Sequence, residues 1–415
     1  MGQWPISLSQ QTRSAFTDRS FSGFNTPAYV IDEELLVSNL KLLKQVRERI
    51  GAKILLAQKA YSCFATYPLI ARYLSGTTAS GLFEAKLAKE EFPDGEVHVY
   101  SAAYRPGEVE ELAEFCDHIV FNSFEQWQRC LPILNDASIR RERPIEVGLR
   151  INPEYSEQEY SMYDPAASGS RLGIRHSEFV KGVEKYGLEG ISFLHFHTLC
   201  EQGAEPLHNT LKVVEEKFGS YLKQLKALNL GGGHHLTRAD YNLDLLAADV
   251  EHLKESYDLE IYLEPGEAVV LDCGYLVASV LDIVGSDEEI AILDTSATCH
   301  MPDVLEMPYR PRCFKLSYDL TDNTYPLAGE AGAYKHTYLF GGPTCLAGDV
   351  FNKYSFPEPL SIGDKVVFCD MALYSFVKNN TFNGMPLPAL VLRKDDDTYQ
   401  VIKAFDYQDF KMRLS

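Results

Sequence analysis

The sequence predicts an α/β protein: a (β/α)8 barrel of the TIM type with a C-terminal β-rich domain, itself a barrel or sandwich. Between residues 50 and 270, short apolar runs alternate with helical patterns. Eight such units over about 220 residues approach the ~250 residues typical of a (β/α)8 barrel. After residue 275, apolar runs separated by turns continue, whereas long helical patterns stop.

The eight expected barrel strands are the apolar runs at 53–59, 77–82, 98–102, 118–123, 146–152, 191–198, 227–232 and 260–266. Helical patterns between them include 83–92, 106–116, 123–134 and 237–257. The longest insertion, 153–173, follows the fifth strand. This strict alternation predicts a parallel sheet.

The expected strands of the second domain are residues 275–284, 289–295, 335–342 and 364–370, followed by a hairpin over 389–405. A chain of 415 residues is too long for one ordinary core. We therefore expect a barrel domain at 33–272 and a β-rich domain built from 1–32 and 273–415.

Composition excludes several classes of protein. The net charge of −20 argues against a nucleic-acid partner and mildly favours a polycationic substrate. No apolar run approaches the ~18 residues of a membrane span, and the N-terminus lacks a secretion signal. The nine cysteines form no CxxC pair, so we expect reduced thiols and a cytoplasmic protein.

Polar residues follow the expected strands where a (β/α)8 barrel builds its active site. They are Lys59 after the first strand, Arg150 and Asn152 in the fifth, His195 and His197 in the sixth, Gly231–Gly233 after the seventh and Glu264–Gly266 after the eighth.

These groups suit one cofactor. Desolvation lowers the pKa of a lysine at an apolar strand end, which makes Lys59 a candidate Schiff-base nucleophile. A glycine triplet before a helix lets backbone amides approach a phosphate. A carboxylate can hold a pyridine nitrogen protonated, and an imidazole can stack on the ring. Pyridoxal phosphate satisfies all four demands, and Arg150 joins the candidates that bind it.

Other interpretations of single residues stay open. Lys59 alone could be a surface lysine whose stem packs on apolar groups. The glycine triplet alone could be a turn. A metal site from His195, His197, His234 and His235 is conceivable, but no carboxylate or thiol stands at a recognisable ligand spacing, so we expect no metal.

The segments from "TPAYVID" (26–32) to "TFNGMP" (381–386) resemble the pyridoxal-phosphate decarboxylases of the alanine-racemase-like barrel class, which act on ornithine, arginine, diaminopimelate or carboxynorspermidine. The resemblance implies that Lys59 holds the cofactor and that His197 stacks on its ring. It further implies that Gly231, Gly232 and Gly233 form the phosphate loop, that Glu264 pairs with the pyridine nitrogen, and that Gly266 lies near the phosphate.

The same resemblance assigns roles in the second domain. Cys345, in "FGGPTCLAGD", would reach the neighbouring subunit's site and deliver the proton that replaces the carboxylate. Tyr374 would bind phosphate and Phe382 would line the pocket. Asp294 and Asp349 are candidates for holding a substrate amine. The resemblance therefore implies a homodimer with shared active sites.

Departures from the family pattern indicate a subfamily. Glu267 stands where the family usually has arginine, and "HTLCEQ" and "EPGEAV" resemble the carboxynorspermidine and carboxyspermidine decarboxylases of polyamine biosynthesis. A pocket enriched in Glu267, Glu201, Asp303 and Asp349 would suit a substrate with several amines. The alternatives are a diaminopimelate or other basic amino-acid decarboxylase, an amino-acid racemase, or a non-catalytic protein that binds the cofactor.

Overall fold

The computed structural model describes residues 21, 23–142, 144–158, 160–285, 287–316, 326–396 and 398–415. The chain divides into two compact units. The first contains residues 39–269, and the second contains residues 270–415 with residues of the 8–38 segment.

The first unit is a parallel sheet that closes on itself, as the sequence predicts. Its strand order is β5-β4-β3-β2-β10-β9-β8-β6-β7, and β5 also pairs with β6. The strands are β2 (Lys53–Ala57), β3 (Gly76–Ala79), β4 (Glu96–Tyr100), β5 (His118–Phe121), β6 (Glu146–Asn152), β7 (Ile174–Arg175), β8 (Phe193–His195), β9 (Ala227–Asn229) and β10 (Glu260–Leu263).

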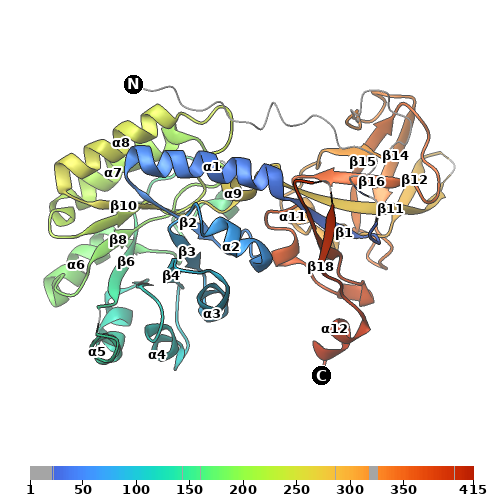
Figure 1. The fold of residues 1–415 in the computed structure, drawn as a ribbon. Helices are drawn as coiled ribbons and strands as arrows, with labels where there is room; N and C mark the ends of the chain where they lie inside the picture. Colours follow the sequence, from blue (N-terminus) through green and yellow to red (C-terminus); the bar gives the residue numbers. More distant parts are fainter. Residues whose placement is uncertain are drawn as a thin grey trace. The chain divides into compact units, whose positions relative to one another are not determined.

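Helices lie outside these strands (Figure 1). They are α1 (Glu33–Ile50), α2 (Tyr67–Ile70), α3 (Leu82–Glu91), α4 (Glu108–Ala113), α5 (Phe124–Arg140), α6 (His176–Tyr186), α7 (Ala204–Leu222), α8 (Leu243–Tyr257) and α9 (Glu267–Val270). In the described part of the chain, no helix combines the length and apolar character that crossing a membrane requires.

Three elements differ from the sequence prediction. Strand β7, which among the described strands pairs only with β6 and lies outside the closed ring of eight strands, was not expected. Helix α8 begins at Leu243 rather than near residue 237, because the Asn242 side chain accepts a hydrogen bond from the Leu245 amide at 3.1 Å and caps the helix there. Strand β8 ends at His195, so His197 lies just beyond the strand instead of inside it.

The middle of the barrel is apolar. Leu55, Val120, Phe193, Ala227 and Tyr262 form a buried cluster contributed by five strands. Gly148 makes room for Phe193, because a Cβ at residue 148 would lie 2.5 Å from the Phe193 ring. The barrel is thus a packed core and not a pore.

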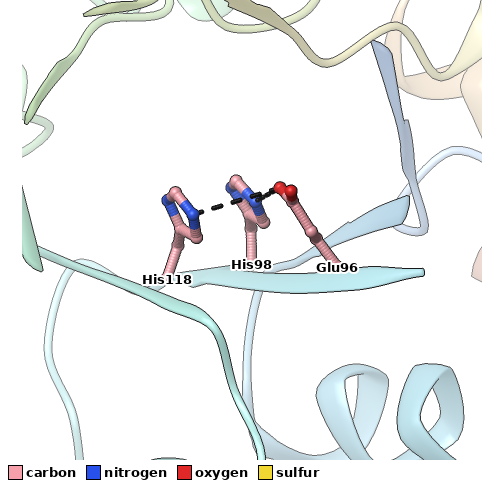
Figure 2. Close-up of side chains that lie close together, drawn as sticks. All are labelled: Glu96, His98 and His118. Carbon is pink, nitrogen blue, oxygen red and sulfur yellow. Dashed lines mark hydrogen bonds and ion pairs between the residues drawn. The ribbon is translucent and has the colours of Figure 1, made fainter. Parts of the chain in front are cut away.

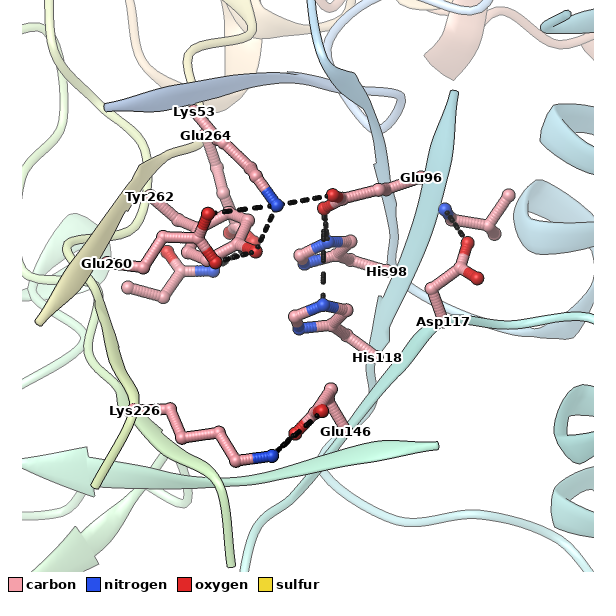
Figure 3. A network of polar contacts seen from close by, with 12 residues as sticks. Lys53, Glu96, His98, Asp117, His118, Glu146, Lys226, Glu260, Tyr262 and Glu264 are labelled. Carbon is pink, nitrogen blue, oxygen red and sulfur yellow. Dashed lines mark hydrogen bonds and ion pairs between the residues drawn. The ribbon is translucent and has the colours of Figure 1, made fainter. Parts of the chain in front are cut away.

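A polar network fills the end of the barrel where the strands begin (Figure 3). Lys53 Nζ lies 2.6 Å from Glu96 Oε1 and 3.0 Å from Glu260 Oε1. Figure 2 shows Glu96, His98 and His118 in a row, with the two rings stacked 3.8 Å apart and 9° from parallel. Burial lowers the pKa of His118 to about 2, so this ring is neutral.

Glu96, His98 and His118 are the one group of three or more in the described residues whose metal-ligating atoms lie close together. The nitrogen lone pairs of two parallel, stacked rings point along parallel planes. Metal binding requires lone pairs that converge on one point, so this arrangement does not suit a metal ion. Glu96 also pairs with the Lys53 ammonium. The group is therefore a packed cluster of polar side chains at the end of the barrel where the strands begin.

The second unit is the predicted β-rich domain. Its sheet has the order β15-β14-β12-β11-β1-β17-β18, and β16 pairs with β11 and β13. The strands are β1 (Ala28–Asp32), β11 (Gly274–Val284), β12 (Glu289–Leu293), β13 (Cys313–Lys315), β14 (His336–Gly341), β15 (Val350–Phe356), β16 (Lys365–Cys369), β17 (Ala389–Arg393) and β18 (Tyr399–Lys403). Its helices are short: α10 (Ala297–His300), α11 (Asp303–Glu306) and α12 (Tyr407–Met412).

Both faces of this sheet are buried in places. Along β11, Leu276 and Ala278 pack into one apolar cluster, while Tyr275 and Val277 pack into another. Successive side chains of a strand point to opposite faces, which explains why this strand is a nearly continuous apolar run. The hairpin expected at 389–405 is present as the antiparallel pair β17 and β18.

Candidate functional site

Lys59 lies two residues beyond the end of β2, at the mouth of the barrel. The Gln58 amide donates to the Thr78 carbonyl at 3.1 Å, and the Ala60 amide donates to Ala57 at 3.1 Å, so the backbone around Lys59 is fixed. The lysine is surrounded by barrel residues yet keeps an exposed surface toward the pocket. Burial lowers its pKa, and the nearby Arg150 lowers that pKa further. A larger fraction of this amine is therefore neutral and nucleophilic than in a free lysine.

A pocket opens around Lys59 within the first unit. It brings together five residues that the sequence analysis expected to bind the cofactor: Lys59, Arg150, His197, Gly232 and Glu264. The lining is formed by Ala57, Lys59, Thr78, Ala79, Ser80, Tyr100, Arg150, His195, His197, Gly232 and Glu264.

Glu264 is held by two neighbours. The Asn229 Nδ2 group donates to Glu264 Oε1 at 2.8 Å, and His195 Nε2 lies 3.5 Å from Glu264 Oε2. Burial raises the pKa of Glu264, but His195 and the Asn229 amide outweigh burial and lower it to about 2. Burial lowers the pKa of His195. The site therefore holds an ionised carboxylate between the Asn229 amide and the His195 ring.

His197 is fixed as one neutral tautomer. Its Nδ1 accepts a hydrogen bond from the Gly232 amide at 2.9 Å, which assigns the ring proton to Nε2. Burial lowers the pKa of His197 well below the usual value, and Lys59 and Arg150 lower it further. A neutral ring in a fixed plane can stack on a flat heterocycle without bringing in a charge.

Arg150 anchors the opposite wall. It is buried in β6, and its Cζ lies 4.6 Å from the centre of the Tyr100 ring, a cation–π distance. Its Nη2 group donates to the His197 carbonyl at 3.4 Å. Arg150 thus supplies a permanent positive charge near Lys59.

The glycine turn lies against the Glu264 backbone. The Glu264 amide donates to the Gly231 carbonyl at 2.8 Å. A Cβ at residue 232 would lie 2.5 Å from the Glu264 carbonyl oxygen, so only glycine fits there. Gly231 has φ +71°, a left-handed conformation that favours glycine. This close backbone approach explains the glycines in physical terms.

These residues fit pyridoxal phosphate. The pocket presents an amine with a lowered pKa, an ionised carboxylate, a neutral imidazole and a bare glycine turn. The cofactor needs an amine for its aldehyde, an anion for its pyridine nitrogen, a flat partner for its ring and backbone room for its phosphate.

Glu267 lies outside this lining. It is buried, and its Oε2 accepts a hydrogen bond from His235 Nε2 at 2.8 Å. Gly266 lies in the same turn, where a Cβ would come within 2.5 Å of the Ala60 Cβ. Gly233, in the turn after β9, accepts a hydrogen bond from the Gln202 amide at 3.0 Å.

The four histidines considered above as metal ligands have separate neighbours. His195 lies beside Glu264, His197 beside Gly232, His234 beside the Leu230 carbonyl and His235 beside Glu267. Each ring is oriented toward its own neighbour, so the four do not form one coordination sphere.

In the second unit, Asp349 is buried and fully engaged. It accepts hydrogen bonds from Ser296 Oγ at 2.9 Å, from the Thr298 amide at 3.1 Å and from Thr344 Oγ1 at 2.7 Å. These contacts hold the start of α10 and the loop between β14 and β15. The expected contact of Asp349 with a substrate amine stays a prediction.

Asp294 and Asp303 also have partners within this unit. Asp294 accepts from Thr26 Oγ1 at 2.6 Å and from the Ser279 amide at 2.8 Å, and burial raises its pKa. Asp303 pairs with the Lys378 ammonium. Their geometry identifies structural contacts, whereas their expected roles toward substrate remain predictions.

Cys345, Phe382 and Tyr374 lie in loops of the second unit. Cys345 is exposed, and its amide donates to the Asn383 side chain at 2.6 Å. Phe382, the neighbour of Asn383, has 43% of its surface exposed. Tyr374 is half-buried and has φ +50°, a conformation uncommon for a residue other than glycine. Cys345 and Phe382 therefore stand near one another on an accessible surface.

Sequence reasoning missed Asn229 and Tyr100. Asn229 lies two residues after Ala227 on β9, and Tyr100 lies two residues after His98 on β4. Residues two apart on a strand point to the same face, and Ala227 and His98 both face the inside of the barrel. The alternation of side chains along a strand could have identified them.

Comparisons with known proteins show the family to which this chain is related. A family model described as "Pyridoxal-dependent decarboxylase, C-terminal sheet domain" matches residues 28–372. A carboxynorspermidine/carboxyspermidine decarboxylase of Campylobacter jejuni is 42% identical over 95% of this chain and 99% of that protein. A carboxyaminopropylagmatine decarboxylase of Synechocystis is 37% identical over 95% of this chain and 96% of that protein.

Solved structures give the same fold. The crystal structure of carboxynorspermidine decarboxylase from Campylobacter jejuni, complexed with norspermidine, has a TM-score of 0.82 and 41% identity over 94% of this chain and 100% of that one. Diaminopimelate decarboxylase from Helicobacter pylori has a TM-score of 0.77 at 18% identity, over 95% and 98% of the two chains. This second likeness concerns the fold alone. The chain belongs to the family of pyridoxal-phosphate-dependent decarboxylases.

Proposed function

We propose that this enzyme decarboxylates carboxynorspermidine, carboxyspermidine or both, and releases norspermidine or spermidine. The observation that carries this proposal is the nearly full-length similarity to two carboxynorspermidine/carboxyspermidine decarboxylases, at 42% and 36% identity. The pocket around Lys59 is consistent with it. The net charge of −20 also favours a polycationic substrate.

Pyridoxal phosphate supplies an electron sink for the carbanion left when carbon dioxide departs. Lys59 would hold the cofactor through its amine and return to it after each turnover. Glu264, ionised by its neighbours, would keep the pyridine nitrogen protonated. His197 would stack on the ring, with its plane fixed by the Gly232 amide. Gly231–Gly233, Gly266, Tyr374 and Arg150 are the proposed contacts of the cofactor's phosphate and negative charge.

A second candidate substrate is carboxyaminopropylagmatine. The Synechocystis relative named for it is 37% identical over nearly the whole chain, so the two functions lie close together in this family. The substrates differ at the end remote from the carboxylate, where one carries a guanidinium and the other an amine. Asp294, Asp349 and Phe382 are the proposed contacts of that end.

We also propose a homodimer in which each site takes Cys345 from the partner chain. An exposed thiol beside an exposed phenylalanine is suited to an interface. The Cys345 thiol would give its proton to the carbanion, and the resulting thiolate would take a proton from water. The nine cysteines form no disulfide bond, which supports a reducing, cytoplasmic location.

The substrate is tested by incubating the holoenzyme with carboxynorspermidine, carboxyspermidine, carboxyaminopropylagmatine and diaminopimelate, and identifying the products by mass. We expect release of carbon dioxide from the two carboxylated triamines. One methylene separates them, so their kcat/KM values should differ by no more than roughly 200-fold. Turnover of diaminopimelate without turnover of any triamine would contradict the proposal.

The role of Lys59 is tested by borohydride reduction of the holoenzyme followed by peptide mapping. We expect the cofactor label on Lys59 alone, because its lowered pKa gives this amine a larger neutral fraction than a free lysine has. The rate at which apoenzyme binds the aldehyde should fall as the pH drops through that lowered pKa. In Lys59→Ala the label and the visible absorbance of the bound cofactor should disappear; a label on another lysine would reassign the role.

Asn229→Ala removes the donor to Glu264 and the acceptor of the Gly231 amide. We expect kcat to fall about tenfold or more, because a charge-assisted hydrogen bond contributes ~1.5–3 kcal/mol. KM should stay within about threefold of wild type, because the substrate does not contact Asn229. Steady-state kinetics at saturating cofactor measure both constants, and an unchanged kcat would show that Glu264 is positioned without Asn229.

Shared sites are tested by mixing two inactive variants, Lys59→Ala and Cys345→Ala. Random exchange of subunits makes half of the dimers hybrid, and each hybrid contains one intact site. Activity should therefore recover to roughly a quarter of wild type. Each variant incubated alone is the control, and absence of recovery despite verified subunit exchange would place Cys345 in the site of its own chain.

A further inference from the structure

Two loops at the mouth of the barrel carry the groups proposed to hold the cofactor. The loop after β9 contains Gly231–Gly233, and the turn after β10 contains Glu264–Gly266. Three hydrogen bonds join the loop after β9 to this turn and to the start of α9. The Glu264 amide donates to Gly231 at 2.8 Å, Thr237 Oγ1 donates to the Ala268 carbonyl at 2.7 Å, and His235 Nε2 donates to Glu267 Oε2 at 2.8 Å.

The His235–Glu267 bond is the one that joins two side chains. Only 7% of His235 and 8% of Glu267 are exposed, so water competes weakly for either group. A buried carboxylate that loses its donor is strongly disfavoured. The pair therefore resists separation of the two loops.

The packing between the loops is too tight to absorb a shift. A Cβ at Gly232 would lie 2.5 Å from the Glu264 carbonyl oxygen, and the same glycine fixes His197 through its amide. A movement of the start of α9, which carries Glu267, would also move the adjoining turn with Glu264. Gly232 and the plane of the His197 ring would then shift with it. The glycine turn, the nitrogen partner and the stacking ring thus depend on one another.

We propose that Glu267 and His235 are positioning residues: together they clamp the two loops that hold the cofactor, and Glu267 does not contact the substrate. This inference rests on the proposed cofactor contacts of these loops. It replaces the expectation that Glu267 meets a substrate amine, because its carboxylate is buried, bonded to His235 and outside the pocket lining.

The test compares Glu267→Gln, Glu267→Ala, His235→Ala and the double variant Glu267→Ala/His235→Ala with wild-type holoenzyme. The measurements are the rate of pyridoxal phosphate release after dilution into a scavenger of the free cofactor, and KM for carboxynorspermidine at saturating cofactor. Asp249→Asn is the matched control. It alters a similar His–Asp pair, His208 Nδ1 to Asp249 Oδ1 at 2.7 Å, that joins α7 and α8 on the outside of the barrel.

We expect Glu267→Ala and His235→Ala each to speed cofactor release about tenfold or more, the loss typical of a charge-assisted hydrogen bond. The double variant should release the cofactor no faster than the more affected single variant, because both changes remove the same interaction. Glu267→Gln keeps an acceptor for His235 and should restore most of the retention. Asp249→Asn should match wild type, and KM should stay within about threefold in every variant.

Two results would overturn the clamp. One is cofactor release at the wild-type rate in both alanine variants. The other is a KM raised tenfold or more in Glu267→Gln with cofactor release unchanged, which would make Glu267 a substrate contact. Cofactor release is measured without substrate, so failure of the clamp is distinct from failure of the proposed decarboxylation, which the substrate panel tests on wild-type enzyme.

Discussion

Closure of the barrel through the β5–β6 ladder is the constraint on which the site depends. A closed parallel sheet leaves no edge and brings the ends of all eight strands to one rim. Lys59, Arg150, His195 and Glu264 come from segments up to two hundred residues apart, and only this closure makes them neighbours. An open sheet with the same strands would hold them in a line.

Two lysines, one at the start of β2 and one just beyond its end, have different pKa values because their environments differ. At the start of β2, burial would lower the pKa of Lys53, but hydrogen bonds to Glu96, Tyr262 and Glu260 raise it. Just past its end, burial lowers the pKa of Lys59, and Arg150 adds to that effect. The first lysine is held as a cation by its acidic neighbours, whereas the second has a larger neutral fraction than a free lysine.

The acidic residues that seemed suited to a polyamine divide in the same way. Glu264 faces the pocket as an ionised group, whereas Glu267, Asp349 and Asp303 are engaged by partners within their own units. The overall negative charge still attracts a polycation to the enzyme, and specificity arises at closer range.

The sequence by itself determined the eight strands, the β-rich second domain and the ring of Lys59, His197, the glycine turn and Glu264. Strand periodicity and the rule that barrel sites gather at carboxyl ends depend on local order, which the chain displays directly. Only the tertiary structure decided that the Asn229 side chain forms hydrogen bonds with both Glu264 and Gly231, and that His235 forms a hydrogen bond with Glu267. Such pairings join side chains some thirty residues apart across adjacent strands, and which of several donors meets a carboxylate depends on packing that no local pattern records.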